Sequence, residues 1–197
     1  MPYLLRKRLG NVSIVIMEAM SNIILIGPMG AGKTTQGKWL ARHLGREFVD
    51  LDVFIEQSTG TDIMHIFETE GEVGFRKREA EALAFVLNRD NLVLSTGGGT
   101  VLAEANRLLL KQRGTVIYLH LPPEMQLQRL ASDRKRPLLQ FPDRAERLQQ
   151  LSVVRTPLYH QCADITLDLS QVPMSQVKHR ILDAITDYFA ETSRHHA

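Results

Sequence analysis

The sequence predicts an α/β fold in which a parallel sheet of five strands is covered by helices on both faces. Two observations carry this prediction. Five short apolar runs alternate with longer segments of helical periodicity, which is the pattern of parallel strands joined by crossover helices. The first run leads into a glycine-rich turn that opens a helix. A chain of 197 residues, 44% of them hydrophobic, can bury one sizeable core, so we expect one main domain.

The first strand is expected at residues 23–26, directly before Gly27-x-x-x-x-Gly32-Lys33-Thr34. This spacing is the pattern of a P-loop, whose backbone N–H groups curl around phosphate oxygens. Lys33 adds a cation for the β- and γ-phosphates, and the hydroxyl of Thr34 suits a Mg²⁺ ligand. A helix follows, ends at Gly45 and points its positive end at the same phosphates. Its expected buried face consists of Trp39, Leu40, His43 and Leu44. The segment therefore predicts nucleotide binding.

Two carboxylates follow at the end of the second expected strand, in Asp50-Leu51-Asp52. Carboxylates two residues apart in an extended segment point to opposite sides, so we expect them to have separate roles. Asp50, beside the P-loop, is placed to hold a water of a Mg²⁺ shell. Asp52 begins a helical stretch, and it either faces a different ligand or only caps that helix.

A short helix that ends at Gly71 is expected next, followed by a longer helix over residues 72–87. The buried stripe of the longer helix is expected to be Ala80, Leu83, Ala84 and Leu87. Arg76 and Glu79 lie three residues apart on one face of this helix. They form either a surface ion pair or a guanidinium that Glu79 holds in place for an anionic substrate.

The third strand, at residues 91–95, leads into Gly97-Gly98-Gly99. Adjacent glycines suit a place where the backbone must come very close to a ligand, although a flexible turn would also explain them. Further helices are expected at 103–112, from 122 towards 130, and at 174–189, with strands at 115–121 and 164–169. The charged run at 129–147 is either a solvated loop or a mobile lid that brings an arginine onto a transferring phosphate.

Composition excludes several classes of partner. The formal net charge of +2 gives no support to nucleic acid or an acidic membrane as the main partner, and no stretch is long enough for a membrane span. The single cysteine, Cys162, excludes an internal disulfide and fits a reducing compartment, so we expect a cytoplasmic protein. Residues 1–20 are expected to be a disordered or non-native extension before a domain at 21–192.

Over about residues 21–190 the chain resembles the shikimate kinases, P-loop NTPases with the fold of the nucleoside-monophosphate kinases. The resemblance rests on an ordered set of motifs rather than on the P-loop alone. The set consists of the P-loop, Phe48-Val-Asp50-x-Asp52, Gly74-Phe75-Arg76-x-x-Glu79, Ser95-Thr-Gly97-Gly98-Gly99, Arg134-Lys-Arg136-Pro137-Leu-Leu139 and Arg155-x-Pro157-Leu-Tyr159. One departure is Gly74, which stands where the family has bulkier residues, and it is expected to loosen the segment that carries Arg76.

The resemblance implies ATP-dependent phosphorylation of the 3-hydroxyl of shikimate, which gives shikimate 3-phosphate and ADP in aromatic amino acid (chorismate) biosynthesis. It implies one Mg²⁺ per subunit, ligated by Thr34 and, through water, by Asp50. It also implies a lid at about residues 129–143. We expect a monomer whose partners are ATP and shikimate, without nucleic acid or membrane.

Individual roles follow from the same resemblance. The implied ATP-binding residues are Gly30, Ala31, Gly32, Lys33, Thr34, Thr35, Arg129, Arg136 and Gln171, with Pro173 beside them. The implied shikimate-binding residues are Asp52, Arg76, Gly97, Gly98, Gly99 and Arg155. Catalysis would rest on Lys33, Asp52 and Arg136. Asp52 would orient the 3-hydroxyl and could deprotonate it, while Arg76 and Arg155 would clamp the carboxylate of shikimate.

Other nucleotide-binding classes fit less well. A gluconate kinase would also bind a hydroxylated carboxylate, but the combination of Phe75-Arg76 with Gly97–Gly99 favours shikimate, and it disfavours a nucleoside-monophosphate kinase. A guanine-nucleotide switch needs an Asn-Lys-x-Asp segment, which the sequence lacks. A motor ATPase would place an aspartate at the end of a later strand. A catalytically silent binding module would be expected to have lost Lys33, Asp52 or Arg136.

Overall fold

The structure is a computed structural model that describes residues 22–130 and 143–195. In chain order its elements are β1 (Asn22–Ile26), α2 (Lys33–Leu44), β2 (Glu47–Asp50), α3 (Leu51–Thr59), α4 (Ile63–Leu87), β3 (Leu92–Ser95), the 3₁₀ helix η1 (Thr100–Leu102), α5 (Glu104–Arg113), β4 (Gly114–His120), α6 (Pro123–Arg129), α7 (Arg144–Cys162), β5 (Ile165–Asp168) and α8 (Met174–His195). The five expected strands are confirmed, each to within a few residues. The expected N-terminal extension and the centre of the expected lid lie outside the described residues.

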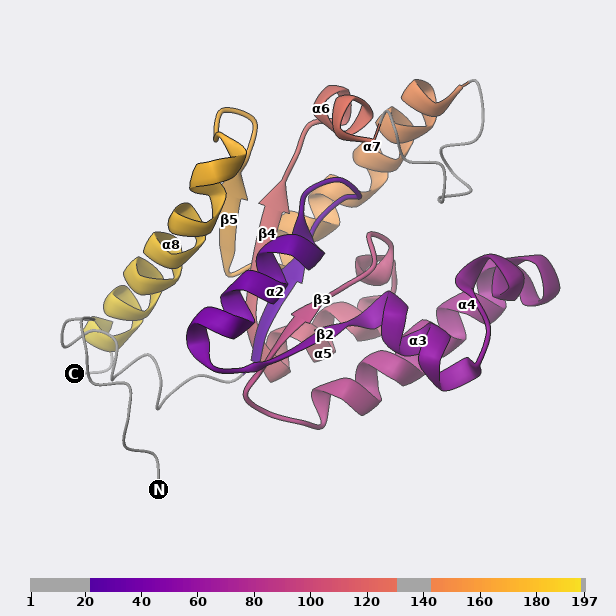
Figure 1. Cartoon of the computed structure of the whole chain (residues 1–197), viewed down its shortest axis with the longest axis horizontal. Helices are drawn as coiled ribbons and strands as arrows, with labels where there is room; N and C mark the ends of the chain where they lie inside the picture. Colours follow the sequence, from indigo (N-terminus) through magenta and orange to yellow (C-terminus); the bar gives the residue numbers. More distant parts are fainter. Residues whose placement is uncertain (1–21, 131–142, 196–197) are drawn as a thin grey trace.

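The five strands form one parallel sheet in the order β2-β3-β1-β4-β5. β1 is therefore central, with β3 on one side and β4 on the other. Because all strands are parallel, the segments that follow β1, β2 and β3 all begin on the same side of the sheet, at the carboxyl ends of the strands (Figure 1). Ligands of open α/β sheets bind at the carboxyl ends of the strands, beside the strand where the direction of the strand order reverses.

Helices pack on both faces of the sheet (Figure 1), because alternate residues of each buried strand face opposite sides. Ile24 and Ile26 of β1 face a core built with α3, α4, α5 and α7. Ile23 and Leu25 face a second core, which contains α2 and α8. The interior strands are buried on both sides, which explains why their sequences read as continuous apolar runs.

Helix faces were predicted less well than strands. In α2 the buried face contains Gln36, Gly37, Leu40 and Ala41, together with Lys33. Trp39 is only half-buried and stacks on exposed His43, with ring centroids 5.0 Å apart, so the expected face was displaced towards the aromatic residues. In α4 the expected Leu83 and Leu87 are buried, whereas Ala80 is only partly buried and Ala84 is exposed. The buried residues of α4 are Ile66, Phe75, Glu79, Ala82, Leu83, Val86 and Leu87.

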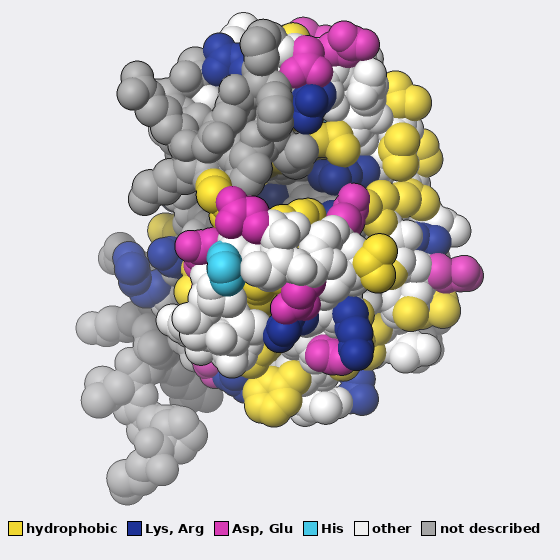
Figure 2. Space-filling view, turned by 90° about the vertical axis from the view of Figure 1, so that its right-hand side faces the viewer, with side chains coloured by type: hydrophobic (Ala, Val, Ile, Leu, Met, Phe, Trp, Pro, Cys, Tyr) yellow, Lys and Arg dark blue, Asp and Glu magenta, His cyan; other side chains and the backbone are white. Residues whose placement is uncertain are grey.

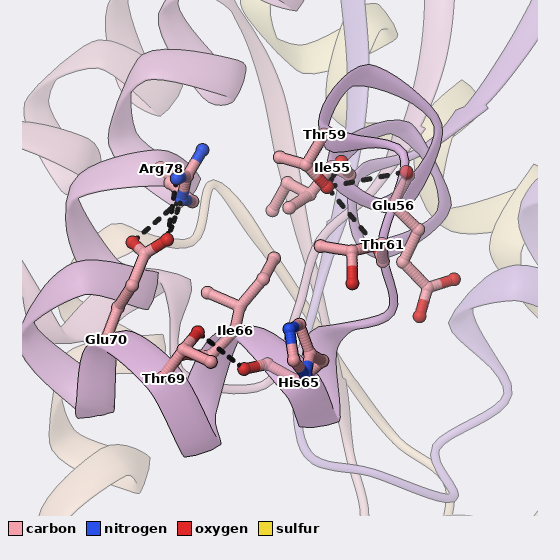
Figure 3. A network of polar contacts seen from close by, with 9 residues as sticks. All are labelled: Ile55, Glu56, Thr59, Thr61, His65, Ile66, Thr69, Glu70 and Arg78. Atoms are coloured by element: carbon pink, nitrogen blue, oxygen red, sulfur yellow. Dashed lines mark hydrogen bonds and ion pairs between the residues drawn. The ribbon is translucent and has the colours of Figure 1, made fainter.

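α4 is interrupted at Gly71, where the two expected helices meet at a kink. Gly71 has φ 68° and ψ −173°, a conformation that side-chain-bearing residues rarely adopt. An ion pair between Glu70 and Arg78, at 2.6 Å, spans the kink (Figure 3). A β-carbon at Gly74 would overlap the side chain of Glu70. Gly74 therefore does not simply loosen the helix, as expected, but gives this bend the room that it needs.

Candidate active site

The turn after β1 has the backbone of a phosphate-binding loop. Gly27, Gly30 and Gly32 have φ angles of 139°, 78° and 88°, which turn the chain back on itself. At Gly27 a β-carbon would also lie 2.5 Å from the carbonyl oxygen of Leu119, so the position has no room for a side chain. The Nζ of Lys33 donates to the carbonyl oxygens of Gly27 and Pro28 at 2.7 and 2.8 Å. Among the described residues no side chain caps α2. The first N–H groups of a helix point along its axis towards the segment that precedes it, which here is the loop.

Asp50 ends β2 and caps α3. Its Oδ2 accepts a hydrogen bond of 2.7 Å from the hydroxyl of Thr34, and its Oδ1 accepts from the N–H groups of Asp52 and Val53. The strand thus ends at Asp50, and Asp52 lies in the first turn of a helix rather than in an extended segment. The premise of the spacing argument was wrong, and so was the alternative that Asp52 is the cap. The two carboxylates nevertheless make different contacts.

Asp52 lies against the glycine segment that follows β3. A β-carbon at Gly97 would lie 2.8 Å from Oδ1 of Asp52 and 3.1 Å from Oε1 of Glu79. A β-carbon at Gly99 would overlap the guanidinium of Arg76. These glycines have ordinary negative φ angles or extended backbone, so space rather than conformation requires them. The segment lets backbone approach the side chains of Asp52 and Arg76 directly.

Arg76 is held by two glutamates on its own helix. Its NH1 donates to Oε2 of Glu79 at 2.7 Å, while Nε and NH2 donate to Oε1 of Glu72 at 3.3 and 3.2 Å. Glu79 is fully buried, and its Oε1 accepts from the hydroxyl of Thr100 at 2.7 Å. Of the two interpretations of the Arg76–Glu79 pair, the geometry favours a guanidinium fixed in place over a surface pair. Thr100 was not predicted as part of this arrangement.

Arg155 reaches the same place from α7. Its NH1 would lie 3.6 Å from a β-carbon at Gly98, as would the hydroxyl of Tyr159, which donates to the carbonyl oxygen of Gly98 at 2.5 Å. Burial raises the pKa of Tyr159, and the nearby positive charges of Arg155 and Arg76 oppose that rise. The charges of both guanidinium groups thus act on the same hydroxyl. The Nε of Arg155 is buried and has no hydrogen-bond partner among the described residues.

This arrangement presents two guanidinium groups, a carboxylate and the partly exposed backbone of Gly98 close to a phosphate loop. Comparisons with known proteins agree with it. A sequence model of the family described as Shikimate kinase matches residues 29–186. The shikimate kinase of Psychrobacter arcticus is 46% identical over 178 residues, covering 90% of this chain and 96% of the relative. That of Acinetobacter baumannii is 49% identical over 168 residues, covering 85% and 93%.

The chain belongs to the shikimate kinase family. Solved structures agree: a shikimate kinase from Acinetobacter baumannii in complex with shikimate is 48% identical, with a TM-score of 0.82 over 87% of this chain and 96% of that one. A shikimate kinase from Aquifex aeolicus is 36% identical, with a TM-score of 0.72 over 83% and 95%. The expected family, the α/β P-loop fold and the ATP-dependent kinase class, with its place in aromatic amino acid biosynthesis, are therefore confirmed.

A depression lies beside the phosphate-binding loop and the start of α2. Its lining residues are Gly30, Gly32, Lys33, Thr34, Thr35, Arg129, Leu130 and Met174. Arg129 donates to the carbonyl oxygen of Gly30 at 3.3 Å, and burial lowers its pKa. Met174, the first residue of α8, is half-exposed and lines this pocket. Gln171, expected beside the nucleotide, is exposed in the turn before α8 and does not line it.

Of the remaining residues predicted for this shikimate kinase family member, some are described by the structure and others are not. Ala31 is buried inside the loop, whereas Thr35 is exposed at the start of α2. Arg134 and Arg136 lie outside the described residues. The flanking helices are described, and α6 brings Leu130 next to Gly30. The sequence had no signal for Leu130 or Thr100, because both act through contacts that only the folded chain creates.

Proposed function

We propose that the chain transfers the γ-phosphoryl group of ATP to the 3-hydroxyl of shikimate with the residues assembled here. The observation that carries this proposal is the arrangement around Gly97–Gly99. The side chains of Asp52, Arg155 and Arg76 each lie close to one of these three glycines. Shikimate combines a carboxylate with several hydroxyl groups. Two arginines suit the carboxylate, because guanidinium groups offer paired donors to its oxygens. Asp52 suits the hydroxyls, which can donate to it.

The P-loop side of the site would hold the phosphates of ATP. Backbone amides at the start of α2 point into the loop, and Lys33 would exchange its two carbonyl partners for phosphate oxygens. The donor pair of Thr34 and Asp50 fits Mg²⁺, which prefers hard oxygen ligands and needs few of them from the protein when phosphates contribute. When bound, the ion would neutralise charge on the β- and γ-phosphates. Arg129 and Met174 flank the side on which the nucleotide base would lie.

In the transfer step the 3-oxygen of shikimate forms a bond to the γ-phosphorus while the bond to the bridging oxygen of ADP breaks. Asp52 orients the hydroxyl and accepts its proton. Lys33 and Arg136 balance the negative charge that is shared between the donor and the acceptor. Phosphoryl transfer depends chiefly on such positioning and charge stabilisation. Arg76 and Arg155 hold the substrate so that its 3-hydroxyl, and not another hydroxyl, faces the phosphate.

Substrate identity is best tested in one ATP-coupled assay with shikimate, gluconate and AMP as acceptors. Shikimate should be phosphorylated at the 3-position in the presence of Mg²⁺, and gluconate and AMP should not. Product position can be assigned from phosphorus–proton couplings. Turnover of gluconate or AMP without turnover of shikimate would overturn the proposal.

The protein is further proposed to act as a cytoplasmic monomer that binds neither nucleic acid nor membrane. The face over α3 and α4 mixes basic, acidic and hydrophobic side chains (Figure 2), unlike a surface built for a polyanion. In the described part of the chain, no helix is both long and apolar enough to cross a bilayer. Cys162 is buried, and burial raises the pKa of its thiol to about 11, as expected for a core residue rather than a nucleophile. Sedimentation at several protein concentrations would test the monomer.

A further inference from the structure

Asp50 contacts both halves of the active site through different oxygens of one carboxylate. Oδ2 accepts from the hydroxyl of Thr34, in the first turn of α2, at 2.7 Å. Oδ1 accepts from the backbone N–H groups of Asp52 and Val53, in the first turn of α3, at 3.2 and 3.5 Å. The side chain of Asp50 therefore links α2, the helix proposed to face the phosphates, with α3, the helix that carries Asp52.

The contact through Oδ1 holds the first turn of α3, which carries Asp52. Asp52 is the second residue of α3, and its own N–H is one of the two groups that Asp50 caps. N-terminal amides of a helix have no partner within the helix, so removal of the cap allows the first turn to open. The buried side chain of Leu51 anchors this turn, and the cap connects its backbone N–H groups through Asp50 to Thr34 on the P-loop side. An opened turn would move Asp52 away from Gly97.

We propose that Asp50 is a positioning residue for Asp52, and that it couples Thr34 to the substrate site through the cap of α3. This inference rests on the proposed function, because it takes Asp52 as a ligand of shikimate. It differs from a role in the Mg²⁺ shell in one measurable respect. A residue that serves only the metal affects shikimate binding only when metal and nucleotide are present. A residue that holds Asp52 affects shikimate binding in their absence.

The test is calorimetric titration of the whole protein with shikimate in EDTA, without nucleotide. Asp50→Ala removes the cap and should weaken shikimate binding roughly three- to tenfold, the range that loss of a helix cap permits. Asp50→Asn should bind within about twofold of the wild type, because asparagine caps a helix as well as aspartate does and keeps an acceptor oxygen. Asp50→Asn should still raise the Mg²⁺ concentration required for turnover, since its charge is lost.

Asp62 provides a matched control. It caps α4, the next helix, by accepting from the N–H of His65 at 2.7 Å, and it lies before the kink at Gly71. Asp62→Ala should lower the melting temperature about as much as Asp50→Ala does but leave shikimate affinity unchanged. Equal losses of affinity in both variants would mean that any helix-cap loss loosens the site, and the positioning role of Asp50 would be wrong. Wild-type affinity in Asp50→Ala would also overturn it.

The coupling to Thr34 is tested by a double-mutant cycle on the same titration. Thr34→Val removes the donor to Oδ2 and should weaken shikimate binding in the wild-type background but not in the Asp50→Ala background. Additive effects would show that Thr34 and Asp50 act separately, which contradicts the coupling. Absence of shikimate binding by the wild-type protein would instead contradict the proposed function, so the two failures are distinguishable.

Discussion

Arg76 and Glu79 form an ion pair of 2.7 Å in which the guanidinium is partly exposed to the site while the carboxylate is fully buried. A buried carboxylate is costly unless each oxygen has a partner, and the second oxygen of Glu79 accepts from Thr100. Thr100 directly follows the glycine segment. The pair therefore connects the backbone that approaches the substrate with the arginine proposed to bind it.

Replacement of Thr100 by valine should expose the importance of this connection. The change leaves one oxygen of Glu79 buried without a donor, which should lower the free energy of unfolding by about 1–3 kcal/mol. Arg76 would be held less firmly, so the KM for shikimate should rise severalfold while kcat changes less. Thermal melts and steady-state kinetics check both effects. Thr100→Ser keeps the hydroxyl and should restore the KM. Loss of stability with an unchanged KM would limit Thr100 to a structural role.

Substitutions in the glycine segment should separate an effect on protein packing from an effect on shikimate binding. Gly97→Ala places a methyl group 2.8 Å from Oδ1 of Asp52, so it should lower both the melting temperature and kcat/KM. Gly98→Ala meets its nearest neighbours at an ordinary 3.6 Å, so it should leave the melting temperature nearly unchanged. It should still weaken shikimate binding, because the methyl group occupies space that the substrate needs. Calorimetry and thermal melts on the two variants provide the comparison. Normal shikimate affinity in Gly98→Ala would place the substrate elsewhere.

Sequence predicted the sheet and the phosphate loop well because both depend on local pattern. Each strand is a continuous apolar run, and the loop has a fixed spacing of glycine, lysine and threonine. The faces of α2 and α4 were predicted less well, since a helix can bury Gly37 against Phe48 while Trp39 remains at the rim. Hydrophobicity alone favours the tryptophan.

The site was predicted as a set of residues but not as a set of contacts. Asp50, Asp52, Arg76 and Arg155 were all named, yet the cap formed by Asp50 and the bond from Thr100 to Glu79 were not. The cap was missed because the strand was expected to run two residues too far, which placed Asp52 in extended backbone instead of in the first turn of a helix. Thr100 lies 21 residues from Glu79, and no local pattern links them.

Asp52→Asn should separate chemistry from nucleotide binding. The amide can still contact a hydroxyl group but cannot accept its proton, so kcat should fall by roughly 10²- to 10⁴-fold. Affinity for ATP should remain nearly intact, because Asp52 lies beside Gly97 rather than on the P-loop side. Rapid-quench kinetics and equilibrium nucleotide binding measure the two quantities. Near-normal turnover would show that Asp52 is not the residue that activates the substrate.

Replacement of the arginines should have two different kinetic effects, according to whether the residue binds the shikimate carboxylate or acts on the transferring phosphate. Arg76 and Arg155 are proposed to bind the carboxylate of shikimate equally in the ground and transition states, so their replacement by alanine should raise the KM for shikimate. Arg136 is proposed to act on charge that develops between ATP and the acceptor. An arginine in that role contributes roughly 10³-fold or more to kcat, so Arg136→Ala should lower kcat far more than it weakens shikimate binding.

Arg134 and Arg136 supply the decisive comparison, because they share one basic run and differ only in the proposed role. Arg136→Lys should recover part of the lost kcat, since an ammonium group keeps the charge but lacks the forked donors of a guanidinium. Arg134→Ala should be mild if the rest of the run is a solvated loop. Steady-state kinetics at saturating ATP distinguish these variants. Equally mild effects of Arg134→Ala and Arg136→Ala would mean that the run is surface charge, and the transferring phosphate would then need another cation.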